Sequence, residues 1–134
     1  MERISFDNGD KKVQINDSGD FIVIPMGDNT FPQRVIDFSK KAEDQYNILL
    51  EKEIELKGSD IEVLSNMRAG VLLGVGQLFD GLFGEGSCKK VFGNLAPSMD
   101  IMVTFMEQIA PLVNKFATER QSEIEAKYMK KGRR

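Results

Sequence analysis

The chain has 134 residues, of which 41% are hydrophobic, so its composition excludes a chain that is disordered throughout. The formal net charge of -3 argues against nucleic acid as the main partner. The single cysteine, Cys88, excludes an internal disulfide, and no histidine is present to serve as the base of a catalytic thiol.

The first 26 residues show the alternation of a small antiparallel sheet. Apolar side chains alternate with polar ones in residues 4–6 and 13–15, and residues 21–24 form a third apolar run. Residues 7–10 contain Asn-Gly, a strong hairpin signal, and residues 17–20 form a second turn. The sequence therefore predicts a three-stranded meander. The acidic turns lack the spacing of an EF-hand, so we interpret them as solvated turns rather than calcium sites.

A long amphipathic helix is predicted from Thr30 to about Leu56. Residues 30–33 match a capping box, with proline tolerated in the first turn. Lys57-Gly58 closes the helix before the next one starts, and so short a connection predicts an antiparallel helical hairpin. The apolar face of this helix consists of Val35, Phe38, Ala42, Tyr46 and Leu49.

A second, more apolar helix is predicted from Ser59 to Phe83. Residues 59–62 form another capping-box pattern, with Ser59 as the cap. Gly70 and Gly74 lie four residues apart, which indicates close packing in the protein's own core or a docked partner helix. We expect one buried group made of Leu64, Met67, Val71, Leu78 and either Phe105 or Met106.

A glycine-rich turn follows the second helix, and Pro97 and Ser98 then open a third. Pro111 lies inside its apolar pattern and predicts a kink. The chain closes on basic residues, interpreted as a solvated C-terminus, with contact to an acidic partner as the alternative. The apolar stripe of the third helix consists of Met102, Met106, Ile109, Val113 and Phe116, and the basic residues are Lys127, Lys130, Lys131, Arg133 and Arg134.

The predicted fold is α+β and mainly α: the N-terminal three-stranded antiparallel meander, then three main helices packed as a small bundle. We expect a single domain over residues 1–134, with the meander in 1–28, the helical part in 29–131 and a basic tail end in 132–134.

The sequence shows no pattern that carries chemistry. Gly74-Val75-Gly76 and Gly84-Glu85-Gly86 are not phosphate loops, because neither continues as Gly-Lys-Ser/Thr. No pair of carboxylates stands out in an apolar setting. We therefore expect no enzyme, no catalytic residue, no cofactor and no metal site.

Three features together resemble a known class of proteins. They are the small β N-terminus, the stretches of residues 78–86 and 89–93, and the charged helical C-terminus. This combination is similar to the tail assembly chaperones of long-tailed phages and prophages of Gram-positive bacteria, which are encoded between the tail tube protein and the tape measure protein. The resemblance runs over most of residues 1–130.

The resemblance implies a protein that binds the tape measure protein, keeps it soluble and helps to recruit tail tube subunits in the host bacterial cytoplasm. A homo-oligomer is compatible with this role, whereas nucleic acid and membrane are not expected as partners. Two rivals are a structural tail component and a phage-encoded inhibitor of a host protein. The residues that we expect to bind a partner are Phe79, Phe83, Val91, Phe92, Met102 and Met106.

Overall fold

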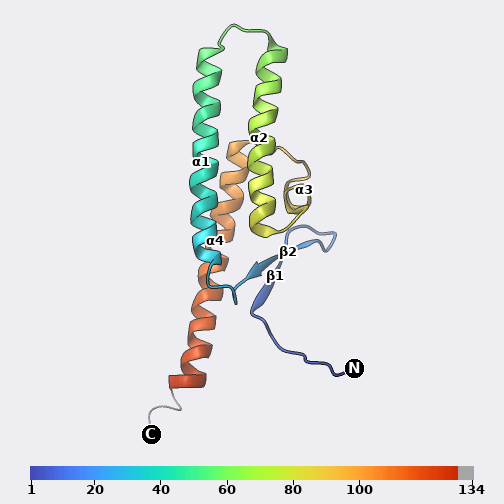
Figure 1. Cartoon of the computed structure of the whole chain (residues 1–134), viewed down its shortest axis with the longest axis vertical. Coiled ribbons are helices and arrows are strands. Elements are labelled where there is room, and N and C mark those ends of the chain that lie inside the picture. The colour runs from blue at the N-terminus through green and yellow to red at the C-terminus, as the bar shows by residue number, and fades with distance from the viewer. Residues whose placement is uncertain (130–134) are drawn as a thin grey trace.

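The computed structural model describes residues 1–129, so most of the predicted basic tail lies outside the described part. A β-hairpin is followed by a long helical hairpin, a short helix and a second long helix (Figure 1). The fold is therefore mainly helical α+β, as predicted in outline. Its elements are β1 (Asp10–Gln14), β2 (Phe21–Pro25), α1 (Phe31–Glu55), α2 (Ile61–Phe83), α3 (Ser87–Phe92), α4 (Met99–Ile124) and a π-helical turn, Glu125–Met129.

The sheet has two antiparallel strands within residues 1–129, with Val13 opposite Ile22. The side chain of Asn16 accepts hydrogen bonds from the amides of Ser18 and Asp20, which holds the connecting turn. Ile22 and Ile24 point into the helical core, so this small sheet is stabilised by packing on the helices.

The prediction of a third strand is wrong. Ile4 and Phe6 lie in irregular chain and are almost fully exposed. Asn8-Gly9 forms no hairpin turn, and Gly9 lies close against the backbone of Gly27. Two alternating apolar residues bury too little surface to hold an additional strand.

The two long helices α1 and α2 form the predicted antiparallel hairpin (Figure 1). Neither predicted capping box is formed. Thr30 is the N-cap of α1, but its hydroxyl accepts no hydrogen bond from a helix amide and instead donates to the carboxylate of Asp28. Helix α2 is capped by Asp60, one residue after the predicted Ser59, and the Asp60 carboxylate accepts from the Glu62 amide at 3.0 Å.

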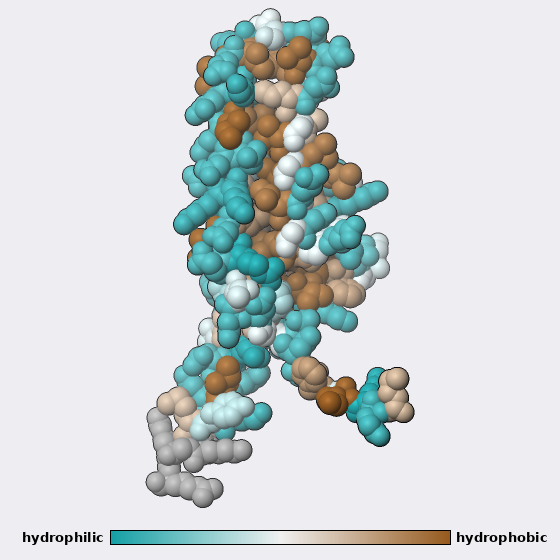
Figure 2. Space-filling view, in the orientation of Figure 1, coloured by the Kyte–Doolittle hydropathy of each residue, from teal (hydrophilic) through white to brown (hydrophobic). Residues whose placement is uncertain are grey.

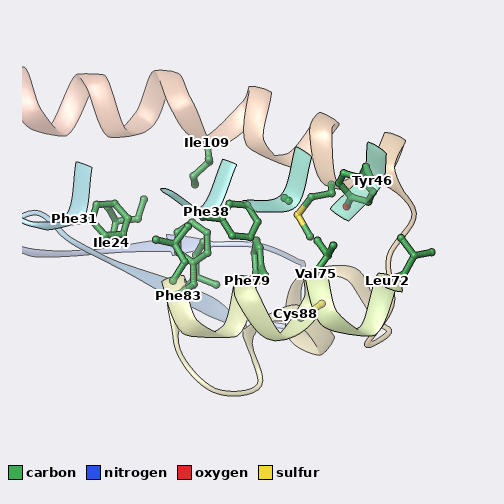
Figure 3. Close-up of a cluster of buried hydrophobic side chains, with 14 of the residues drawn as sticks. Ile24, Phe31, Phe38, Tyr46, Leu72, Val75, Phe79, Phe83, Cys88 and Ile109 are labelled. Atoms are coloured by element: carbon green, nitrogen blue, oxygen red, sulfur yellow. The ribbon is translucent and has the colours of Figure 1, made fainter. Parts of the chain in front are cut away.

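The core lies where the β-hairpin, α4 and one half of the helical hairpin meet (Figure 3). This half is the one farther from the α1–α2 loop, and we call it the lower half because it is lower in Figure 1. Phe79 is completely buried at its centre and makes edge contacts with three other rings. The ring centroids lie 6.1 Å from Phe38, 5.1 Å from Phe92 and 5.4 Å from Phe105. Edge-to-face contacts of this kind add to the free energy gained by burial.

The predicted buried face of α2 is displaced. Met67, Val71 and Leu78 are only half-buried at the edge of the core, and so are Phe105 and Met106 of α4, while Leu64 packs farther out. Helix α2 is apolar on most of its circumference, so its sequence does not determine which side faces inward. The side chains of α2 that are buried in the core are Leu72, Val75, Phe79, Leu82 and Phe83.

The sequence did not predict the short helix α3. Its first turn is held by a side chain from α2, because the Asp80 carboxylate accepts from the amides of Gly86 at 3.2 Å and Cys88 at 2.7 Å. A carboxylate at the positive end of a helix stabilises it. Asp80 thereby fixes the glycine-rich turn between α2 and α3.

Helix α4 lies against the half of the helical hairpin that is farther from the α1–α2 loop. Its C-terminal part extends past the start of α1 (Figure 1). It continues through Pro111 up to Ile124. Its start lies beside the middle of the hairpin, so the loop end of the hairpin projects beyond α4. The molecule is therefore elongated, with an uncovered segment at each end.

Candidate binding grooves beside α4

An apolar groove of about 480 Å³ lies between α1 and α4. Helix α1 contributes Phe38, Ala42 and Tyr46, all buried at its floor. The side from α4 is unusually rich in methionine, a flexible side chain that adapts to varied apolar surfaces. We call this the methionine groove; its α4 side consists of Met99, Met102, Val103, Met106, Glu107 and Ala110.

The rim of the methionine groove is acidic, with Glu43 on α1 and Glu107 on α4. Met99 and Val103 are partly exposed above the floor. An elongated apolar floor between two helices with charges at its edge suits an amphipathic helix that carries basic residues beside its apolar stripe.

The floor of this groove contains an unsatisfied polar group. Tyr46 is 5% exposed, and its hydroxyl has no hydrogen-bond partner within the described residues. Burial, together with the nearby Cys88, raises the pKa of Tyr46 to about 12. A buried hydroxyl without a partner costs free energy, on the order of 1–3 kcal/mol. A bound molecule that offers a hydrogen-bonding group here would remove that cost.

A second groove, of about 440 Å³, lies on the other side of α4, against β1 and α3. We call it the strand groove. It is lined by Val13 and Ile15 from the sheet segment, by Val91 and Phe92 from α3, and by Ile101 among the α4 residues.

The structure separates the six predicted partner-binding residues into three places. Phe79 and Phe83 lie in the core, with ring centroids 4.8 Å apart, and present almost no surface to a partner. Val91 and Phe92 line the strand groove. Met102 and Met106 line the methionine groove, Met102 at its buried floor and Met106 half-buried.

Sequence reasoning missed Tyr46 and Val103 as groove residues, and it did not include Met99 among the residues expected to bind a partner. The sequence correctly assigned Tyr46 to the apolar face of α1. Whether its hydroxyl finds a hydrogen-bond partner depends on the position of α4, which the sequence does not give. Val103 does not belong to the predicted apolar stripe of α4. An apolar residue just outside a buried stripe is the signal that could have indicated an exposed surface.

The glycines of α2 fall into two classes. A Cβ atom on Gly76 would collide with the carbonyl oxygen of Leu95 and would lie 3.1 Å from the Sγ of Cys88. Gly70 and Gly74, which were predicted to pack closely, have nothing within 4 Å of a Cβ in the described part of the chain. Close packing within the protein's own core therefore does not explain them.

The face seen in Figure 2 carries apolar side chains along the seam between α1 and α2. A shallow groove of about 270 Å³ lies on this seam and includes Lys41, Leu78 and Gly81. This groove has fewer apolar residues than the methionine groove.

The thiol of Cys88 is buried. Burial and the neighbouring Asp80 carboxylate raise its pKa to about 11, so the thiol is protonated at neutral pH. Within residues 1–129, no three His, Cys, Asp or Glu side chains are close enough together to hold a metal ion. None of the described helices combines the length and the apolar content needed to cross a membrane.

A family model matches residues 24–134, and its description is a family of unknown function (DUF6673). The chain belongs to the DUF6673 family. The match begins within β2 and includes all the helices, so the residues of the methionine groove lie within the DUF6673 region and β1 lies outside it. No curated protein and no solved structure matches the chain.

Proposed function

We propose that this chain is a non-enzymatic tail assembly chaperone of a long-tailed phage or prophage, which binds an apolar helical segment of the tape measure protein and aids assembly of the tail tube in the host bacterial cytoplasm. The observation that carries the proposal is the methionine groove, an open apolar surface between two helices. The sequence resemblance supplies the identity of the partner.

The groove supports a chaperone role because of its chemistry. Met99 and Met106 are adaptable side chains, and they suit a client that presents several different apolar segments in turn. The unpaired Tyr46 hydroxyl at the floor provides one hydrogen-bonding group for orientation. Glu43 and Glu107 favour a helix with basic flanks over one with acidic flanks.

The test is co-expression of the chain with a tape measure protein, the partner that the resemblance implies. Val103→Glu places a charge on the methionine groove, and we expect at least a tenfold loss of the co-purified partner. Ile48→Glu is the matched control on the same molecule, because Ile48 is 44% exposed and Val103 is 45% exposed, but Ile48 does not line the groove. Both variants should keep the melting temperature of the wild type.

Equal binding by the two variants would contradict the methionine groove as the site. A wild-type chain that captures no tape measure protein would contradict the chaperone role itself. Presence of the chain in purified mature virions would instead favour the structural tail component. Tight binding to a host protein, with none to the tape measure protein, would favour the inhibitor.

A further inference from the structure

The helices α1 and α4 run antiparallel but are staggered. The start of α4 lies beside the middle of α1, where Met99 and Asn47 line one groove. The far end of α4 passes the start of α1, where Ile124 and Pro32 line another pocket. The two helices have 25 and 26 residues, so the stagger leaves residues 48–55 of α1 without α4 and the described residues 125–129 without α1.

The uncovered end of the hairpin continues the surface on which α4 lies. Tyr46 and Asn47 line the methionine groove, and Leu50 and Ile54 follow at helical spacing on the same side of α1. Ile54 is 75% exposed, and Ile61, at the start of α2, is 82% exposed. We call Leu50, Ile54 and Ile61 the tip face.

The uncovered end of α4 also carries apolar side chains. Tyr128 and Met129 are both more than half exposed, and they lie in the turn Glu125–Met129 that ends the described chain. Such side chains recover free energy only when another surface covers them. Each end of the molecule thus lacks the element that the other end carries.

The charges of the two ends are complementary. Residues 51–62, around the hairpin loop, contain five acidic and two basic side chains. The sequence after Ile124 contains one acidic and five basic side chains. Two hairpin tips brought together would repel each other, whereas a tip and a tail attract. The charge pattern therefore favours a head-to-tail contact over a symmetric contact between two tips.

We propose that copies of this chain associate head to tail, with Tyr128 and Met129 of one copy packing on the tip face of the next. The occupant of the tip face is thus a second copy of the chain, which takes the place that α4 occupies on the lower half of the hairpin. A head-to-tail interface closes into a ring or continues as a filament. This proposal does not depend on the chaperone role.

The experiment is sedimentation velocity on the full chain over a concentration series. Wild-type protein should form species larger than a dimer as concentration rises. The tip variant Ile54→Asp/Ile61→Asp changes two exposed side chains, and the tail variant Tyr128→Asp/Met129→Asp changes the other side of the contact. Each variant alone should sediment as a monomer, with the melting temperature of dilute, monomeric wild type.

An equimolar mixture of the two variants decides the geometry. The mixture retains one intact tip and one intact tail per pair, so it should form a 1:1 dimer that does not grow further. Ile48→Asp is the control on a different side of α1 and should assemble like wild type. Addition of 1 M NaCl should weaken wild-type assembly, because salt screens the charge attraction.

Three results would overturn the proposal. The first is a wild-type chain that remains monomeric at every concentration. The second is a tail variant that still dimerises alone, which would show a symmetric contact between tips. The third is a mixture of variants that does not form a dimer although wild type assembles.

Discussion

The two halves of the α1–α2 hairpin are built from the same two helices but are stabilised differently. In the lower half the hairpin is covered by α4 and the β-hairpin, and Phe38, Phe79 and Phe83 form an aromatic core (Figure 3). The half next to the loop contains only the two helices, and Ile54 and Ile61 are exposed there. Helices gain most of their stability from tertiary packing, so the lower half should carry most of the free energy of unfolding.

The largest effect should come from Phe79→Ala. The substitution removes a completely buried ring that contacts four other rings, and such truncations cost about 3–5 kcal/mol. Ile54→Ala is the matched change near the loop, and it should alter stability by less than about 0.5 kcal/mol because the side chain is exposed. Urea denaturation followed by circular dichroism measures both. Similar losses in the two variants would show that the halves are equally packed.

The second effect compares two glycines of α2. Gly76→Ala forces a methyl group against the Leu95 carbonyl, and overpacking of this kind costs about 1–3 kcal/mol. Gly74→Ala meets open space and should stabilise the helix by up to about 1 kcal/mol. The melting temperature should therefore fall for Gly76→Ala and rise for Gly74→Ala. A destabilising Gly74→Ala would mean that the outer face of α2 is covered by something in solution.

The third effect concerns Tyr46, which lies at the boundary between the two halves. Tyr46→Phe removes the unpaired hydroxyl and should stabilise the free protein by about 1 kcal/mol. Tyr128→Phe is the control, because Tyr128 is exposed and should show no change. A loss of stability in Tyr46→Phe would show that the hydroxyl is hydrogen-bonded in solution.

Tyr46 also makes the stability of the protein depend on pH. Burial raises the pKa of Tyr46 from 10.0 to about 12, so the folded state holds its proton more tightly than the unfolded state does. The free energy of unfolding of the wild type is therefore unaffected by this titration below pH 10 and falls as the pH rises through 12. Between these values wild type should lose more stability than Tyr46→Phe does. Parallel losses in the two proteins would contradict a raised pKa.

Much of the fold could be predicted because its long elements have strong periodic patterns. The apolar face of α1, which includes Phe38, Tyr46 and Leu49, is buried as expected, and α2 ends at Phe83 as expected. The predicted third strand failed because Ile4 and Phe6 have no surface to cover. Alternation indicates a strand only where a partner surface exists, and a local pattern does not show one.

The grooves were harder to predict, because they depend on how helices are placed relative to one another. The buried side of α2 was displaced from the predicted one because apolar residues surround that helix. The sequence did not predict helix α3, because this helix has only six residues and is held by Asp80, a residue of another helix. The exposure of Val103 and the unpaired Tyr46 hydroxyl follow from the position of α4, which periodicity alone does not determine.

The smallest effect should come from the ion pair between Glu53 of α1 and Arg68 of α2. The two side chains meet at 2.9 Å near the loop, and both are partly exposed to solvent. Exposed ion pairs contribute about 0.2–1 kcal/mol, so a double-mutant cycle of Glu53→Ala and Arg68→Ala should give a coupling energy in that range. The coupling should fall in 1 M NaCl because the pair is screened.

This ion pair also tests whether the loop end of the hairpin is weakly held. Hydrogen exchange should be faster for amides near the loop than for those around Phe79, and Arg68→Ala should accelerate exchange in residues 48–55 while leaving the lower half unchanged. A coupling energy well above 1 kcal/mol, or slow exchange at the loop end in a monomeric protein, would mean that the two-helix half is stable without a covering element. The tip face would then have no need of a second copy to complete its packing.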